Sequence, residues 1–302
     1  MNDVKGFHLE LTNKCYLKCP RCARTEFINK FGVEKWKNYD LNLNTLKSFL
    51  DIDLSGMRIH LCGNTGDPIY HSQFLDVVEW FKTRGSNIEI VTNGSYKKPF
   101  WWQTLSSLLT DTDSITFSID GLPENFKTYR INADWDTIHT GLVNMIGSDA
   151  KVIWKCIPFR YNESDLDVIE KYAKNLGVDE FIIYNSDRWV DNDDYKPTTT
   201  LHLGQKTKYI KLWNSNISNE IQPECLETNL SHFITASGYY VPCCYMADWN
   251  FYYKTEFYQS KKSYDISKTT ISQILSNEKT INFYNTLTET KLPVCTYNCP
   301  KV

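Results

Sequence analysis

The chain has 302 residues, which suffices for one large core or for a main domain with a smaller appendage. Its 33 basic and 36 acidic residues give a net charge of -3, and no basic run resembles a nucleic-acid-binding surface, so no nucleic-acid partner is expected. Neither a secretion signal nor an apolar run of about 18 residues occurs, so we expect a cytoplasmic protein without a membrane partner. Because that compartment is reducing, the ten cysteines are expected to be thiols or metal ligands.

Up to about residue 187, short apolar strands alternate with amphipathic helices. Strands are expected at about 7–12, 57–62, 88–92, 114–120, 152–158 and 180–185. Apolar residues at helical spacing predict helices near 43–50, 74–81, 100–109, 135–146 and 165–176. This alternation is typical of an α/β fold in which crossover helices wind a parallel sheet.

The first predicted strand is followed by Cys15, Cys19 and Cys22, in the pattern CxxxCxxC. Three thiolates at this spacing can hold three corners of a cubane iron–sulfur cluster and leave the fourth iron open to a non-protein ligand. A zinc knuckle is the alternative. Zinc prefers a complete tetrahedron of Cys and His ligands, and the sequence near Cys22 offers no fourth one.

The second strand leads into the segment Cys62-Gly-Asn-Thr-Gly-Asp-Pro68. Its glycines let the backbone approach a ligand closely, and the carboxylate of Asp67 can offset an ammonium charge. An ordinary turn from strand to helix would use the same residue types, so both interpretations stay open. Cys62 is either a small buried residue or a thiol close to the reaction site.

Three other strands end in polar residues. Asn93 follows the third strand, Ser118 and Asp120 share one face of the fourth, and Asn185 follows the sixth. An Asp that caps the next turn is the alternative for Asp120. The glycines and polar residues at these strand ends, which are candidates for a binding site, are Gly63, Asn64, Thr65, Asp67, Asn93, Ser118, Asp120 and Asn185.

Residues 188–224 interrupt this rhythm and are expected to form a bridging segment with a helix near 207–213. Its acidic run is expected to be a solvated loop, or a cover over the mouth of the barrel.

Beyond the bridging segment lie two pairs of cysteines, which are Cys225 with Cys243 and Cys295 with Cys299. Two short strands joined at Ser237–Gly238, followed by helices near 271–275 and 281–287, would gather the four. Four thiolates occupy every protein-ligand position of a 4Fe-4S cluster, although four thiolates also suit zinc. Cys244, which adjoins Cys243, could replace it as a ligand.

The cysteine motif, with Thr12 and Asn13 before it and Arg24 after it, resembles the radical SAM superfamily. The resemblance implies a partial (β/α)6 TIM-like barrel in which S-adenosylmethionine (SAM) binds the open iron of a 4Fe-4S cluster. In that family a reduced cluster cleaves SAM and releases a 5'-deoxyadenosyl radical, which abstracts hydrogen from a substrate. Arg21 stands where many members have an aromatic residue. By the same resemblance, residues 63–67 bind the SAM amino group, Ser118 and Asp120 the ribose, and Asn185 the adenine or the substrate.

The C-terminal cysteines resemble the twitch domain, a short form of the SPASM domain that carries one auxiliary 4Fe-4S cluster. The expected domains are a radical SAM partial barrel at 1–187, the bridging segment at 188–224 and a small α+β twitch domain at 225–302. The metal ligands are then Cys15, Cys19 and Cys22 in the first domain and Cys225, Cys243, Cys295 and Cys299 in the last.

These resemblances imply an enzyme that oxidises or otherwise modifies a small polar metabolite or a peptide, with a flavodoxin- or ferredoxin-type reductant. The chain starts directly with the first strand, which shifts the expectation slightly toward a small or partner-delivered substrate. One alternative is a peptide epimerase or maturase in which the Cys62 thiol returns a hydrogen atom. An alternative of another class is a non-catalytic iron–sulfur or zinc protein.

Overall fold

The computed structural model describes residues 4–186, 188–190, 192–198, 220–223, 225–226, 232–290 and 292–299. The helix expected near 207–213 lies outside this part of the chain. The fold divides into two compact units. The first unit comprises Met1–Lys14, Asn38–Asn87 and Trp213–Val302, and the second comprises Cys15–Lys37 and Ile88–Leu212.

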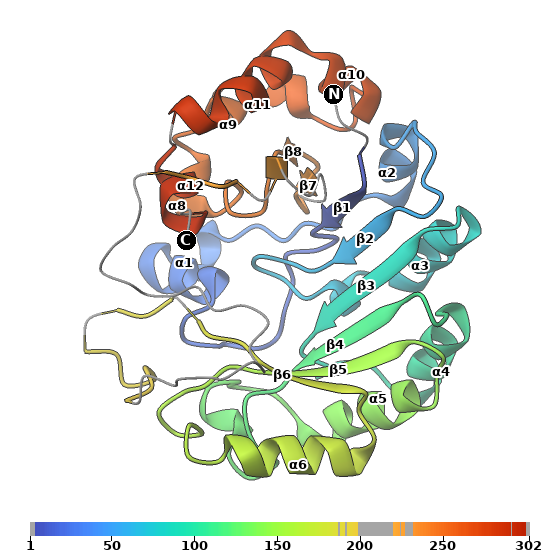
Figure 1. The fold of residues 1–302 in the computed structure, drawn as a ribbon, viewed down its shortest axis with the longest axis vertical. Coiled ribbons are helices and arrows are strands. Elements are labelled where there is room, and N and C mark those ends of the chain that lie inside the picture. Colours follow the sequence, from blue (N-terminus) through green and yellow to red (C-terminus); the bar gives the residue numbers. More distant parts are fainter. Residues whose placement is uncertain are drawn as a thin grey trace. The chain divides into compact units, whose positions relative to one another are not determined.

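The first unit contains the strand order β2-β1-β7-β8 (Figure 1). β1 (Gly6–Leu9) pairs in parallel with β2 (Arg58–Leu61) on one side and with β7 (His232–Ile234) on the other. β8 (Tyr240–Val241) returns antiparallel to β7. The expected turn between these strands is confirmed, and Gly238 takes a φ of 82°, a backbone conformation that glycine adopts without steric cost.

The helices of the first unit bury apolar faces that their sequences define. In α3 (Phe74–Thr83) the buried residues are Phe74, Val77, Val78 and Phe81, which recur at helical spacing. α10 (Ile271–Ser276) begins with a capping box between Thr270 and Gln273, which satisfies backbone donors of its first turn. The other helices are α2 (Leu43–Phe49), η2 (Pro68–Tyr70), α8 (Trp249–Tyr252), α9 (Glu256–Gln259), η4 (Lys261–Tyr264), α11 (Glu278–Thr290) and α12 (Pro293–Asn298).

The second unit holds most of β3 (Asn87–Thr92) and all of β4 (Ser114–Ser118), β5 (Lys151–Cys156) and β6 (Glu180–Ile183), paired in parallel in chain order (Figure 1). Gly141 allows a close contact between two helices, because an added Cβ would lie 2.9 Å from the Trp102 side chain. The helices in the described part of this unit are α1 (Ala23–Phe31), η1 (Val33–Lys35), α4 (Pro99–Leu108), η3 (Phe126–Thr128), α5 (Trp135–Ile146) and α6 (Leu166–Leu176).

The strands expected up to residue 187 are confirmed, with ends one to three residues shorter than predicted at several places. The two compact units cut across the division at residues 187 and 224, because β7 pairs with β1 and joins the C-terminal segment to the start of the chain. Within the described ranges, no helix is both long and apolar enough to span a membrane.

Candidate functional site

Cys15, Cys19 and Cys22 lie in the loop that leads into α1, in the second unit. Cys22 is the N-cap residue of α1, and its amide donates to the carbonyl oxygen of Cys19 over 3.1 Å. Cys19 is buried, whereas the other two are half-buried. The pKa of Cys19 is raised to about 11, chiefly by burial, with Arg130 lowering it and the nearby thiol of Cys22 raising it. A metal cluster would remove this penalty, because it binds the sulfurs as thiolates.

Hydrogen bonds fix the path of this cysteine loop. The amide of Lys18 donates to the carbonyl of Ile131 over 3.0 Å, and the buried guanidinium of Arg24 donates to the carbonyl of Leu17. The Asn93 side chain approaches Cys15, with 3.5 Å between Nδ2 and Sγ. The structure thus brings one predicted polar residue, Asn93, to the cysteine motif.

Arg21 has a partner that the sequence did not reveal. Its Nε donates to Oδ2 of the buried Asp193 over 2.7 Å. Although burial raises the pKa of Asp193, hydrogen bonds from Arg21 and from backbone amides outweigh this and lower it. The residue that departs from the common radical SAM pattern therefore ties the cysteine loop to the segment after β6.

At the end of β4, Asp120 is fully buried and already has two protein partners. Its Oδ2 accepts from Nε of Arg130 over 2.6 Å, and its Oδ1 accepts from the amide of Ile157 over 2.8 Å. Ser118 is 8% exposed and Asn185 is half-buried. The cosubstrate-binding role of these residues stays a prediction. What the structure adds is the buried ion pair, which positions Arg130 near Cys19.

In the first unit, residues 62–67 form a tight loop after β2. An added Cβ at Gly66 would lie 2.0 Å from the carbonyl oxygen of Thr12, so no other residue fits without a backbone shift. Oε1 of Glu10, a residue that the sequence did not single out, accepts from both the amide and the hydroxyl of Thr65, over 2.8 and 2.9 Å. Asp67 is buried and caps η2 by accepting from the amide of Ile69 over 3.3 Å.

The same loop reaches the second set of cysteines. Nδ2 of Asn64 donates to the carbonyl oxygen of Cys244 over 2.7 Å. Asn64 therefore holds the loop after β2 next to the segment that carries Cys243, and both belong to the first unit.

The four C-terminal cysteines converge. Burial raises the pKa of Cys225, and charges on Cys243, Cys295 and Cys299 raise it further. The pKa of Cys295 rises to about 12, through burial and then through Cys243 and Cys299. Cys295 lies on α12, and the amide of Cys299 donates to its carbonyl over 2.7 Å. Four cysteine sulfurs close enough to influence one another make a suitable donor set for a cationic cluster.

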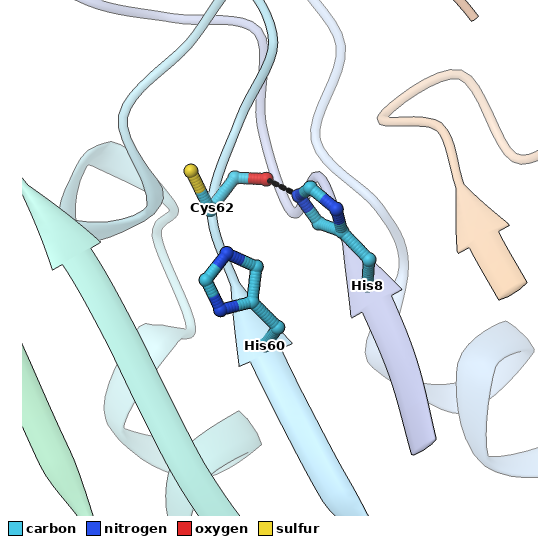
Figure 2. A group of neighbouring side chains, drawn as sticks. All are labelled: His8, His60 and Cys62. Atoms are coloured by element: carbon cyan, nitrogen blue, oxygen red, sulfur yellow. Dashed lines mark hydrogen bonds between the residues drawn. The ribbon is translucent and has the colours of Figure 1, made fainter. Parts of the chain in front are cut away.

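A third group of potential ligands lies on the first unit's strands. His8 of β1, His60 of β2 and Cys62 beyond the end of β2 have ligand atoms that all lie within 4.8 Å of one another (Figure 2). Burial lowers the pKa of His8 well below its usual value, and the neighbouring His60 lowers it further.

The predicted site residues thus fall into two sets, one in each unit. The second unit holds Cys15, Cys19, Cys22, Asn93, Ser118, Asp120 and Asn185. The first holds Cys62, Gly63, Asn64, Thr65, Asp67, Cys225, Cys243, Cys295 and Cys299. The sequence did not reveal three residues that hold these side chains in place, which are Glu10, Arg130 and Asp193. Their partners either lie far away in the sequence or form no recognisable motif with them.

Comparisons with known proteins bear directly on the C-terminal cysteines. Residues 225–300 match the SPASM family, an iron-sulfur cluster-binding domain. Over 200 residues the chain is 26% identical to the tungsten-containing aldehyde ferredoxin oxidoreductase cofactor-modifying protein of Pyrococcus furiosus, a match that covers 60% of this chain and 51% of that protein. The chain spans about half the length of the curated relatives that it matches, with 51% and 57% of two of them covered.

Two solved structures have a similar fold. One is anSMEcpe with bound AdoMet and Cp18Cys peptide, with a TM-score of 0.60 at 13% identity over 97% of this chain and 88% of that one. The other is BtrN in complex with AdoMet and 2-DOIA, with a TM-score of 0.51 at 17% identity over 100% of this chain and 94% of that one.

The fold and the C-terminal match together define an α/β partial barrel with an iron–sulfur cluster-binding domain. Residues 225–300 carry the match to the SPASM iron–sulfur cluster-binding domain, and the chain as a whole shares its fold with solved structures that hold AdoMet. This confirms the predicted fold class, and the C-terminal match agrees with the expected iron–sulfur cluster at the second set of cysteines.

Proposed function

We propose that this enzyme cleaves SAM reductively and abstracts a hydrogen atom from a small polar metabolite or a peptide. The observation that carries the proposal is the cysteine loop, in which Cys15, Cys19 and Cys22 are held by Arg24, Asn93 and the contacts of Lys18. When bound, the cluster and SAM supply a 5'-deoxyadenosyl radical.

The chain's own residues bind and orient these groups. The three cysteines of the loop hold the first cluster as thiolates. Gly63, Asn64 and Thr65 offer close backbone approach to the SAM amino group, in a loop that Glu10 holds through Thr65. Asp67 adds negative charge near the same loop, and the proposed ribose and adenine contacts come from Ser118, Asp120, Asn93 and Asn185.

The C-terminal domain is proposed to be of the twitch form, with one auxiliary cluster on Cys225, Cys243, Cys295 and Cys299. A cluster with four cysteine ligands has no open iron, so it suits electron transfer rather than substrate binding. This favours oxidation of the substrate as the outcome. The physiological reductant is proposed to be a flavodoxin or ferredoxin, and the protein is proposed to work in the cytoplasm.

The names of related proteins support both substrate classes. One solved relative holds a peptide and another holds 2-DOIA, while the curated relative from Pyrococcus furiosus is a cofactor-modifying protein.

A second candidate outcome, epimerisation or maturation of a peptide, depends on Cys62. Its half-buried position at the end of β2 suits a thiol that returns a hydrogen atom.

The test is anaerobic reconstitution followed by iron and sulfide counting and by reaction with dithionite and SAM. We expect about eight iron and eight sulfide for two cubanes and release of 5'-deoxyadenosine. Cys19→Ala should lose about four of each and all 5'-deoxyadenosine, whereas Cys156→Ala, which changes a buried thiol outside both sets, should keep them. Zinc without sulfide in the wild type would instead identify a non-catalytic metal protein.

The outcome at the substrate can be separated from cleavage of SAM. In deuterated water, an epimerase that uses Cys62 would place solvent deuterium in its product, and Cys62→Ala would abolish this while still releasing 5'-deoxyadenosine. Product that gains no deuterium and is oxidised by two electrons would favour the first candidate.

A further inference from the structure

Two histidines and a cysteine lie together on two neighbouring parallel strands of the first unit and at the end of one of them. The strand register pairs His8 of β1 directly with His60 of β2, so the two side chains stand on the same face. Cys62 follows His60 by two residues and therefore faces the same way. Figure 2 shows the three side chains at the C-terminal ends of the two strands.

The geometry is close to that of a metal site. The ligand atoms of the three residues all lie within 4.8 Å of one another. In a tetrahedral zinc site, bonds of about 2.0–2.3 Å place the ligand atoms about 3.3–3.8 Å apart. A side-chain rotation of Cys62, at the end of its strand and next to Gly63, can close this difference of about 1 Å.

The neighbours restrict the rings and leave the group accessible. The imidazoles of His8 and His60 are T-shaped with centroids 4.7 Å apart, and Phe233 of β7 packs edge-on against His8, also at 4.7 Å. All three candidate ligands are half-buried. A ring held from both sides loses little conformational entropy when it binds an ion.

Glu10 is the nearest carboxylate along the same face of β1, and it has other partners. It accepts from the amide and hydroxyl of Thr65 and from the amides of Gly66 and Ala236. Among the residues that the structure describes, this group therefore supplies two imidazoles and one thiolate, with a fourth position for an exchangeable ligand. Three protein ligands with an open fourth position are typical of reactive rather than structural zinc sites.

We propose that His8, His60 and Cys62 bind one zinc ion, whose fourth position takes water or an anionic oxygen or sulfur donor. Cys62 binds as the thiolate, so its proton goes to solvent, and the imidazoles bind as neutral bases. Nε2 of His8 now donates to the carbonyl oxygen of Cys62 over 2.7 Å, and this bond is exchanged for the metal bond if that nitrogen is the ligand. Zinc has no redox chemistry, which makes it compatible with strong reductants.

This site and the Cys62 hydrogen donor exclude each other while the metal is bound. A zinc-bound thiolate has no S–H bond from which a hydrogen atom can leave. Zinc binding by these three residues does not require SAM cleavage, so it can be measured in the absence of SAM.

The experiment uses the protein with both clusters in place, as established by iron and sulfide counts, and adds zinc before gel filtration. We expect one zinc per chain. X-ray absorption at the zinc edge, to which the iron clusters contribute nothing, should show one sulfur at about 2.3 Å and nitrogen or oxygen neighbours at about 2.0–2.1 Å. Zinc surrounded by three or four sulfurs, or less than about a tenth of an equivalent, would overturn the proposal.

Variants assign the ligands. His60→Gln and Cys62→Ser should each weaken zinc binding by more than about a hundredfold, beyond what loss of an outer partner costs. His139→Gln on α5, in the other compact unit, is the matched histidine control and should bind zinc as the wild type does. His8→Gln provides a second test of the imidazole ligands if His60→Gln does not fold. Unchanged zinc affinity in two of the three ligand variants would exclude the site.

Discussion

At the residue scale, cysteine spacing predicts candidate metal ligands, whereas the residues that hold these cysteines in place could not be predicted. CxxxCxxC is a local pattern, so Cys15, Cys19 and Cys22 can be recognised from eight consecutive residues. Arg21 and Asp193 are separated by 172 positions and Glu10 and Thr65 by 55, and single charged residues in a sequence do not indicate such partners. Only the folded chain shows which carboxylate meets which donor.

The buried pair Asp120 and Arg130 leads to a stability prediction. Asp120→Asn would leave the guanidinium of Arg130, whose side chain is 15% exposed, without its negative partner. We expect a loss of about 3–5 kcal/mol in the free energy of unfolding, read from the urea midpoint of the cluster-free protein. Asp111→Asn, which changes an exposed carboxylate, should stay within about 0.5 kcal/mol of the wild type. Equal midpoints for the two variants would show that the ion pair contributes nothing.

At the element scale, apolar periodicity located the strands and the longer helices, because burial of a face repeats along the sequence. α6 is an example, since Leu166, Ile169 and Ala173 are its buried residues and Gly177 ends it with a φ of 99°. α1 was missed because its buried residues are Ala23 and Arg24, at one end, and no apolar stripe follows. α12 was missed for a similar reason, as its six residues are too few for a period to be visible.

The loop after β2 leads to a prediction on glycine. Gly66→Ala places a Cβ against the backbone of Thr12 and Asn13, at 2.0 and 2.6 Å, so one of the two chain segments has to move. We expect a loss of about 1–3 kcal/mol of stability and weaker SAM binding in equilibrium dialysis.

Gly147→Ala is the control for this substitution. Gly147 has a φ of -82°, and the nearest atom to an added Cβ lies 3.9 Å away. Alanine there should be neutral or stabilising by about 0.4–1 kcal/mol. Full stability and full SAM affinity in Gly66→Ala would contradict the assignment of this loop.

At the scale of the whole molecule, the expected order of domains along the chain differs from the observed compact units. Domains expected from a sequence are continuous segments of the chain, so residues 225–302 are predicted to form a domain of their own. In the structure β7 of that segment pairs with β1, at a separation of more than 200 positions, and residues 232–234 continue the sheet of the first unit. Strand pairing at such a separation leaves no local pattern.

The auxiliary cluster should therefore stabilise the first unit beyond its own ligands. In Cys295→Ala we expect loss of that cluster and faster hydrogen exchange at the amides of β7 and β8, by at least about tenfold. Amides of β5 and β6, in the second unit, should exchange at the wild-type rate and serve as the internal reference. Unchanged exchange in β7 despite loss of iron would show that the metal does not support the hairpin.

The pairing of β1 with β7 also sets a constraint on how the protein is made. When the ribosome has released the first sixty residues, β1 can meet β2, yet its other edge has no strand to receive it until residues 232–234 emerge. At synthesis rates of about 5–20 residues per second, that edge waits for roughly ten seconds or more with unpaired amides and carbonyls. Nascent chains of this protein are accordingly expected to need chaperone protection during that interval.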